Sequence, residues 1–264
     1  MKSVRPQIFF FAAIVAMLLM AIAAIGYGEP TAPLHFTRGS SSTFNWSQFS
    51  NVQTDAIAGN ITQLTITGIS QTRAWQGFWG NVSGWITLDD AQNYTFYNWS
   101  AAEPRGFVYA SLVADGDPSW LSVRCFDMAN NATNFDDFYN ITRDAYDNVS
   151  ETFQYEGGAY DTEWYIVNNS RWDCPKTYPF QNDAIQTKNF INSLFYDASK
   201  TYNISAGTAG WIFGAKIENK NVSDKTDLPC YNGQLCDFQL MVAEDGHGTD
   251  TAVTPYYIWV DITA

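Results

Sequence analysis

The feature that most constrains the fold is a series of short segments in which apolar and polar residues alternate. A period of two residues is typical of β-strands that bury one face, and turn-forming residues separate the segments. The segments are 61–69, 82–88, 94–99, 106–113, 121–126, 163–167, 211–217, 238–242 and 256–262. We therefore predict an all-β fold, an antiparallel β-sandwich of the Ig-like or jelly-roll-like kind.

Two pairs of these segments predict hairpins. Residues 89–93 are turn-forming and join the second and third segments. The Gly-rich stretch 244–250 lies between the last two and predicts a terminal hairpin with a long loop. The final segment is so apolar that we expect it to sit centrally or to pair with another strand, because a bare edge of this kind aggregates.

The remaining stretches define the organisation of the chain. Residues 129–210 are less regular and form an insertion in a body that spans 60–264. Within the insertion, 134–146 is acidic and aromatic with a spacing that permits a short helix, and we expect a second short helix over 189–196.

The N-terminus predicts export. Lys2 and Arg5 precede an apolar run over 8–25, which is typical of a signal peptide cleaved before Glu29, with a retained N-terminal anchor as the alternative. No later run is as long, so we expect contact with a membrane only through residues 1–28. Residues 29–59 are rich in Ser, Thr, Pro and Asn, which predicts an extended leader and a candidate donor strand for a neighbour's sheet.

The four cysteines agree with export, because an even number is typical of disulfide-bonded secreted chains. Cys230 and Cys236 flank a turn-like stretch, so we predict a local bridge there, which leaves Cys125 to pair with Cys174. The second bridge closes a long loop and would stabilise the fold by ~3–4 kcal/mol. A zinc site is disfavoured, since no CxxC motif is present and no histidine lies nearby in the sequence.

Glycosylation is the strongest statistical signal in the chain. Eleven asparagines lie in N-x-S/T motifs without an intervening proline, several times more than the composition predicts. Each motif is an acceptor for a bulky, solubilising glycan at an exposed position. The acceptors are Asn45, Asn60, Asn81, Asn93, Asn98, Asn131, Asn140, Asn148, Asn168, Asn203 and Asn221.

Charge and composition exclude two classes of protein. The chain has 264 residues, a formal net charge of −13 and only 16% charged residues, so the phosphates of a nucleic acid would be repelled. Disorder is excluded as well, because ten Trp, fifteen Tyr and eighteen Phe can bury a large apolar area.

Catalytic motifs are missing from the sequence. His35 and His247 are the only histidines, and we interpret both as exposed polar residues. No G-x-S-x-G elbow, HExxH, P-loop or GxGxxG is present, and a zinc or copper centre would lack histidine ligands. We therefore expect no enzymatic activity.

Carboxylates are plentiful, and a glycosidase would need two that face each other. We interpret them instead as acidic turns, two of which suit a structural calcium ion although neither matches the EF-hand pattern. Apart from such an ion we expect no cofactor. The acidic stretches are Asp89–Asp90, Asp115 and Asp117, Asp136–Asp137, Glu244–Asp245 and Asp250.

Four tryptophans lie close together in the sequence, at Trp75, Trp79, Trp85 and Trp99. Rings of this kind can stack on sugars, but the strand-like alternation around them favours a place in the sandwich core.

Four stretches resemble a group of secreted archaeal surface proteins that are largely uncharacterised. The first is AWQGFWGNVSGWITLDDA over 74–91, followed by YNWS and GFVYAS, and the last is DFQLMVAEDGHGTDTAVTPYY over 237–257. The resemblance implies an exported, β-rich, glycosylated protein and transfers no catalytic residue.

Together these patterns lead us to expect an extracellular structural subunit of a cell-surface assembly, such as a filament, sheath or surface layer. Self-association by β-strand addition would follow from the extended leader. The alternative is a carbohydrate-binding module or adhesin at the cell surface, which would have a glycan or another cell as its partner.

Overall fold

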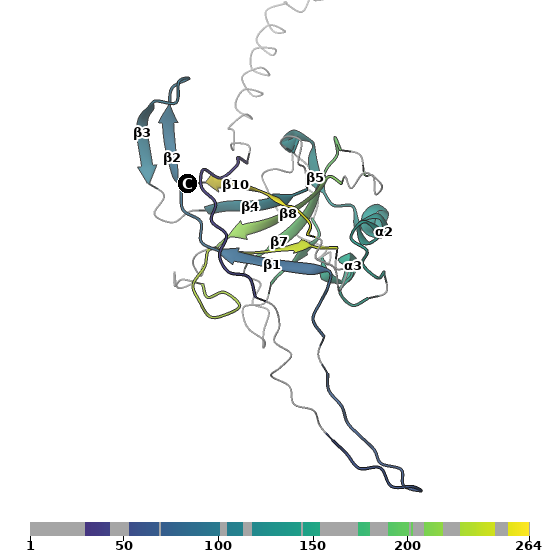
Figure 1. Ribbon diagram of the computed structural model, residues 1–264. Coiled ribbons are helices and arrows are strands. Elements are labelled where there is room, and N and C mark those ends of the chain that lie inside the picture. Colours follow the sequence, from purple (N-terminus) through teal and green to yellow (C-terminus); the bar gives the residue numbers. More distant parts are fainter. Residues whose placement is uncertain are drawn as a thin grey trace, which may run out of the picture.

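The computed structural model describes residues 30–42, 53–68, 70–100, 105–112, 118–143, 145–153, 174–179, 190–200, 202, 209–218, 228–245 and 253–263. The fold is an all-β antiparallel sandwich with a short helical insertion, as the sequence predicts (Figure 1). Within these residues no helix is long and apolar enough to cross a bilayer.

The larger sheet has six strands, and all its pairings are antiparallel. Its order is β10 (Tyr257–Thr263), β4 (Arg105–Ser111), β8 (Trp211–Ile217), β7 (Asn192–Asp197) and β5 (Val123–Cys125), with the short β6 (Lys176–Thr177) also on β7. β8 is central and buried along almost its whole length, which explains its near-continuous apolar sequence. A 3₁₀ turn, Trp120–Ser122, leads into β5.

Two smaller sheets complete the molecule. β1 (Trp75–Gly80) pairs with β9 (Phe238–Ala243), and β9 packs against β8 of the larger sheet. β2 (Trp85–Asp89) pairs with β3 (Thr95–Ser100) in a separate hairpin that stands away from the body (Figure 1).

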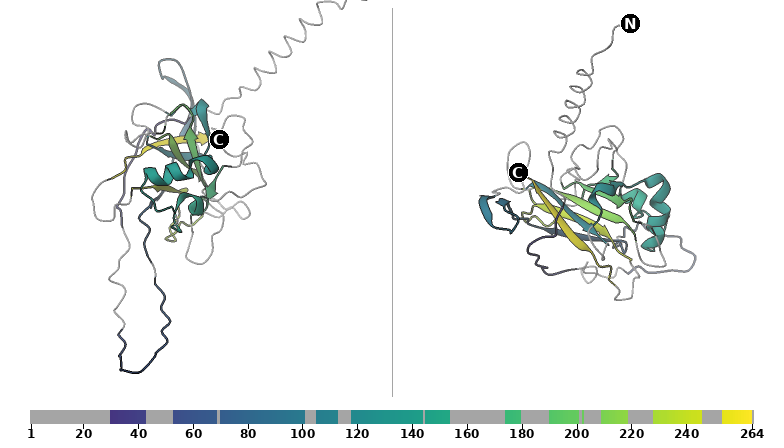
Figure 2. Two further views of the ribbon diagram at one scale, coloured as in Figure 1. Left: turned by 90° about the vertical axis from the view of Figure 1, so that its right-hand side faces the viewer. Right: turned by 90° about the horizontal axis from the view of Figure 1, so that it is seen from above.

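The helices cover one end of the larger sheet, as a view turned by 90° also shows (Figure 2). α2 (Met128–Phe138) begins where the Asp127 carboxylate accepts a hydrogen bond from the backbone N–H of Asn130, a favourable helix cap. α3 (Val149–Thr152) begins in the same way at Asn148. Asp136 of α2 ties the helices together, since its Oδ1 accepts from the Val149 N–H at 3.1 Å.

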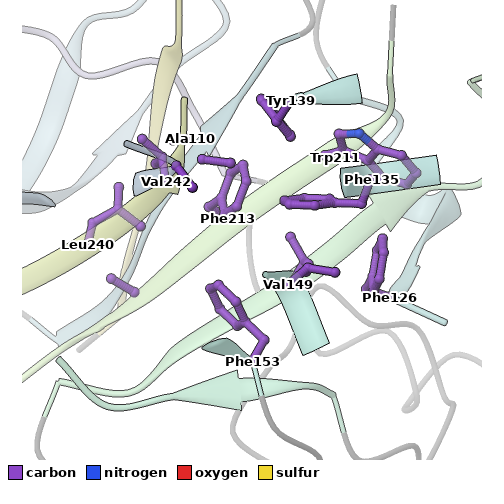
Figure 3. Packing of buried hydrophobic residues seen from close by; sticks show 14 of the residues in the cluster. Ala110, Phe126, Phe135, Tyr139, Val149, Phe153, Trp211, Phe213, Leu240 and Val242 are labelled. Atoms are coloured by element: carbon purple, nitrogen blue, oxygen red, sulfur yellow. The ribbon is translucent and has the colours of Figure 1, made fainter. Parts of the chain in front are cut away.

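The main core is a cluster of rings between β8, the helices and β1 (Figure 3). Phe135 of α2 lies 5.7 Å from the ring of Trp211 and 6.0 Å from that of Phe213, both on β8. Trp75 of β1 packs against this ring cluster from the other sheet. Its ring centroid lies 5.5 Å from that of Phe153. Edge-on and tilted ring pairs of this kind contribute about 0.5–1.5 kcal/mol each beyond their buried area.

One buried amide joins the two packed sheets. Asn192 of β7 is fully buried, and its Nδ2 donates to the carbonyls of Phe190 and Gln239, at 2.9 and 2.6 Å. Its Oδ1 accepts from the N–H of Met241 at 2.6 Å. The side chain thereby satisfies backbone groups of β9 that no neighbouring strand pairs at that point.

Several sequence expectations about individual elements are wrong. The segment 189–196 is not a helix but contains most of β7, because a strand buried on both faces loses its alternation and reads like a helix. The helix expected over 134–146 lies earlier, over α2. The terminal hairpin does not form, since β9 pairs with β1 and β10 with β4. The strand expected over 163–167 lies outside the described residues.

The strand expected over 61–69 is also not formed. Residues 61–68 are not in a strand and are exposed throughout, so their alternating side chains pack against none of the described sheets. The strand that begins the packed body is β1, at Trp75.

We predict that Asn192→Ala lowers the free energy of unfolding by at least about 2 kcal/mol, because it leaves buried backbone groups of β9 without partners. Urea unfolding of the purified protein measures the change. Asn130→Ala is the control, since that amide bonds only on the exposed surface of α2, and it should cost far less. Equal losses for the two variants would contradict the role of Asn192.

Candidate interaction surfaces

The β2–β3 hairpin is built by its own turn. Oδ1 of Asp90 accepts hydrogen bonds from the N–H groups of Gln92 and Tyr94, both at 2.9 Å. Asn93 takes the left-handed conformation with φ of 64°, which asparagine tolerates better than most residues. The predicted turn 89–93 is therefore confirmed, and within its acidic pair Asp90 stabilises the turn while the Asp89 carboxylate accepts a hydrogen bond from the Thr87 hydroxyl.

Gly84 sets the base of this hairpin. A Cβ at this position would meet the Cδ1 atom of Ile262 on β10, so a larger residue would require the end of that side chain to move. Beyond Gly84 the two strands pair with each other and leave the body. We call residues 85–100 the ribbon.

The two faces of the ribbon differ in polarity. Opposite pairs in the register share a face, so Ile86 with Trp99 and Leu88 with Tyr97 form an apolar face. The rings of Tyr97 and Trp99 touch, with centroids 4.6 Å apart. The other face carries Trp85, Thr87 and the glycan acceptor Asn98.

Large apolar side chains on the ribbon are exposed to an unusual degree. Leu88, Tyr97 and Trp99 retain 50%, 54% and 51% of their accessible surface, and Tyr94 and Phe96 near the turn retain more. Contiguous apolar surface of this kind usually marks a site of interaction with another molecule. The alternation predicted a core position for Trp85 and Trp99, and the structure contradicts this because both side chains are exposed and none of the described layers covers the ribbon.

An N-terminal residue covers the edge of the larger sheet. Thr31 donates its N–H to the Val260 carbonyl at 2.9 Å, and Val260 donates back to the Thr31 carbonyl at 2.8 Å. Val260 lies on β10, the outermost strand, so the apolar C-terminal strand is paired on both sides at this point. The first part of the 29–59 leader thus adds to its own sheet.

A second group of exposed rings lies beside the local disulfide. Trp79 of β1 and Tyr231 meet edge to face with centroids 6.0 Å apart, and both side chains are exposed. Tyr231 lies in the loop closed by Cys230 and Cys236. Trp75, by contrast, is in the core and donates its Nε1–H to the Asp147 carbonyl at 2.7 Å. The four tryptophans grouped by sequence are therefore distributed over three different places.

Both predicted disulfides are present. Cys125 is bonded to Cys174 and Cys230 to Cys236, and the partners are separated by 49 and 6 positions in the sequence. Together they indicate an oxidising environment of the extracellular type.

The glycan acceptors differ in accessibility. Asn60, Asn81, Asn93, Asn98 and Asn140 are exposed, whereas Asn131 is half-buried. Asn148 is only 8% exposed, and its Nδ2, the atom that would carry the sugar, donates to the Arg143 carbonyl at 2.6 Å. The acceptors outside the described residues are Asn45, Asn168, Asn203 and Asn221.

Among the described residues, no three histidine, cysteine, aspartate or glutamate side chains lie close enough together to hold a metal ion. Asp137 pairs with Arg143 at 2.6 Å, and His35 is exposed with its Nε2 3.0 Å from the Thr37 hydroxyl. The two stretches suited to calcium lie mostly outside the described residues: Asp115, Asp117, His247 and Asp250.

Two buried carboxyl groups have pKa values above the ordinary value of an aspartate. Burial raises the pKa of Asp261 on β10 to about 6, and its Oδ2 has no hydrogen-bond partner. Burial also raises the pKa of Asp136 to about 6, although its bond from Val149 opposes the shift. Their ionised forms are therefore costly at neutral pH.

A comparison of the chain with family models, with curated proteins and with solved structures finds no match. The interaction surfaces therefore rest on the geometry described above.

We predict that Asn148 stays unmodified in the folded protein, while the exposed acceptors Asn60, Asn81, Asn93, Asn98 and Asn140 carry glycans. The reason is that the Asn148 amide caps α3 and bonds to Arg143, so a sugar would break both contacts. Glycopeptide mass spectrometry measures the occupancy of each acceptor. A fully occupied Asn148 would contradict the burial of this side chain.

We predict that Asp261→Asn stabilises the protein at pH 7.5 and has little effect at pH 4. The folded-state pKa is raised above its ordinary value, so the folded protein binds this proton more tightly than the unfolded chain does. The stability contributed by this group is thus lost as pH rises from about 4 to about 6. Thermal unfolding of both proteins across this range measures the effect, and parallel curves would disprove it.

Proposed function

We propose that the chain is a non-enzymatic, N-glycosylated structural subunit of an extracellular assembly at the cell surface, such as a filament, sheath or surface layer. The observation that carries the proposal is the exposed apolar face of the ribbon, which holds Leu88, Tyr97 and Trp99 in solvent. A contact with another subunit would bury it.

Other features of the chain support this proposal. The two disulfides suit an extracellular medium, and the exposed acceptors would give a charge-poor chain a hydrophilic coat. The resemblance to archaeal surface proteins points to the same location. The pairing of Thr31 with β10 supports assembly by strand addition, since it demonstrates that the edge of the larger sheet accepts an extended segment.

We predict that the mature protein forms ordered assemblies of many copies. Negative-stain microscopy of native surface material, with mass spectrometry to identify the subunit, is the measurement. Sedimentation of the secreted protein provides a check in solution. If native material and purified protein contain only dispersed monomers, the proposal fails.

A carbohydrate-binding module or adhesin is the second candidate. It is favoured by one specific observation, the exposed edge-to-face pair of Trp79 and Tyr231 beside the rigid loop of the Cys230–Cys236 disulfide. Exposed rings held in place by a disulfide-closed loop suit the apolar faces of sugars, with the surrounding polar groups left to orient the ligand.

If this second candidate is correct, Trp79→Ala abolishes retention on a glycan array because it removes half of the ring pair. Tyr94→Ala is the control, since it removes an exposed ring from the tip of the ribbon, away from Trp79, and should leave retention unchanged. Absence of any retained glycan for the unmodified protein would rule the candidate out.

A further inference from the structure

Residues 61–67 have the pattern of a strand, but they form no strand with any of the residues that the structure describes. Leu64 and Ile66 point to one side and Gln63, Thr65 and Thr67 to the other if the segment is extended. In the structure Leu64 is 57% and Ile66 83% exposed, and none of residues 61–67 belongs to a strand. An alternating segment that packs against none of the described sheets is available to a strand of another copy.

The ribbon is a sheet of two strands that could accept a third. A hairpin of two strands is marginally stable in water, and a third strand or a packed layer is normally required. β3 pairs with β2 on one side, and its other edge faces away from the body (Figure 1). Along that edge the apolar face presents two rings, Tyr97 and Trp99. Aromatic rings beside aliphatic side chains on adjacent strands are among the favourable cross-strand pairs.

Charge does not oppose contact between these two elements. The chain has a formal net charge of −13, so two copies repel each other over most of their surfaces. Residues 56–72 nevertheless contain no charged residue, and between 74 and 102 the only charges are Asp89 and Asp90 at the tip of the ribbon. The segment and the outer edge of β3 are thus places where two acidic copies can approach.

The two elements lie at opposite ends of the molecule. Residues 53–68 extend away from the body on the side opposite to the ribbon, both in Figure 1 and in the turned view of Figure 2. The segment therefore cannot reach the ribbon of its own chain in this arrangement. Contacts between different surfaces at opposite ends are heterologous, and they propagate into an open filament when the rotation does not close a ring.

We propose that residues 61–67 of one copy add to the outer edge of β3 in a second copy, as a third strand of the ribbon. Leu64 and Ile66 then lie beside Tyr97 and Trp99 on the apolar face. Asn98 stays on the opposite face, where its glycan covers the polar side without obstructing the contact. This inference rests on the proposed function and identifies its subunit contact, which involves 61–67 rather than the N-terminal leader.

The test of the donor uses charge on one face of the segment. Leu64→Lys/Ile66→Lys should reduce the assembled fraction at least ten-fold in sedimentation velocity, because both lysines fall on the apolar face. Gln63→Lys/Thr65→Lys is the matched control with the same charge on the other face, and it should assemble like the unmodified protein. All four positions are exposed and outside the core, so folding should be unaffected, as circular dichroism and thermal unfolding can verify.

The test of the acceptor compares two tryptophans of the ribbon. Trp99→Lys places a charge on the apolar face and should block assembly, whereas Trp85→Lys alters an equally exposed ring on the opposite face and should not. Mixing then tests the pairing itself. The Leu64→Lys/Ile66→Lys variant keeps its ribbon and Trp99→Lys keeps its segment, so the mixture should form dimers that grow no further.

The outcomes separate this inference from the proposed function. If the unmodified protein assembles and the Leu64→Lys/Ile66→Lys variant assembles equally well, or if the mixture of defective variants remains monomeric, the contact proposed here is wrong while the structural role stands. If the unmodified protein does not assemble, both are overturned.

Discussion

The structure depends on the packing of aromatic rings against one buried strand. β8 lies in the middle of the larger sheet, and its Trp211 and Phe213 hold α2, α3 and β1 through Phe135, Phe153 and Trp75. Because β9 also packs on β8 and pairs with β1, the smaller sheet takes its position from the same rings. Asn192 then aligns the two sheets through hydrogen bonds. Such bonds require a particular geometry, whereas hydrophobic contacts do not.

Some apolar residues lie outside this core. The ribbon and residues 61–67 reach beyond the packed layers, and neither contributes to the clusters around β8. Exposed glycan acceptors at Asn60, Asn93 and Asn98 lie on or next to these outlying elements. Hydrophilic sugars beside uncharged apolar strands would keep a single copy dispersed while leaving one face of each strand available to a neighbour. The acidity of the chain also helps to keep single copies apart, while the ribbon carries charge only at its tip, at Asp89 and Asp90, and residues 61–67 carry none.

Local patterns explain which predictions about the fold are confirmed. The turn 89–93 was predictable because Asp90 and Asn93 act on their immediate neighbours. The local disulfide between Cys230 and Cys236 was predictable because little chain separates the two residues, and the second bridge followed by elimination. β7 was mistaken for a helix because burial on both faces removes the alternation that marks a strand. The terminal hairpin was wrong because the pairing of distant strands depends on which sheet each one joins.

The sequence by itself determined the class of the fold, the two disulfides and the positions that glycans can occupy, because each follows from residue type and short-range spacing. Only the tertiary structure decided which apolar segments are buried. Trp75 and Trp99 have similar local surroundings, yet one packs against Phe153 and the other remains in solvent on the ribbon. An alternating sequence indicates that a strand has an apolar face, but it does not indicate whether a second layer packs on that face. For this reason Trp75 packs against the core, whereas Trp99 remains available for a contact with a second copy.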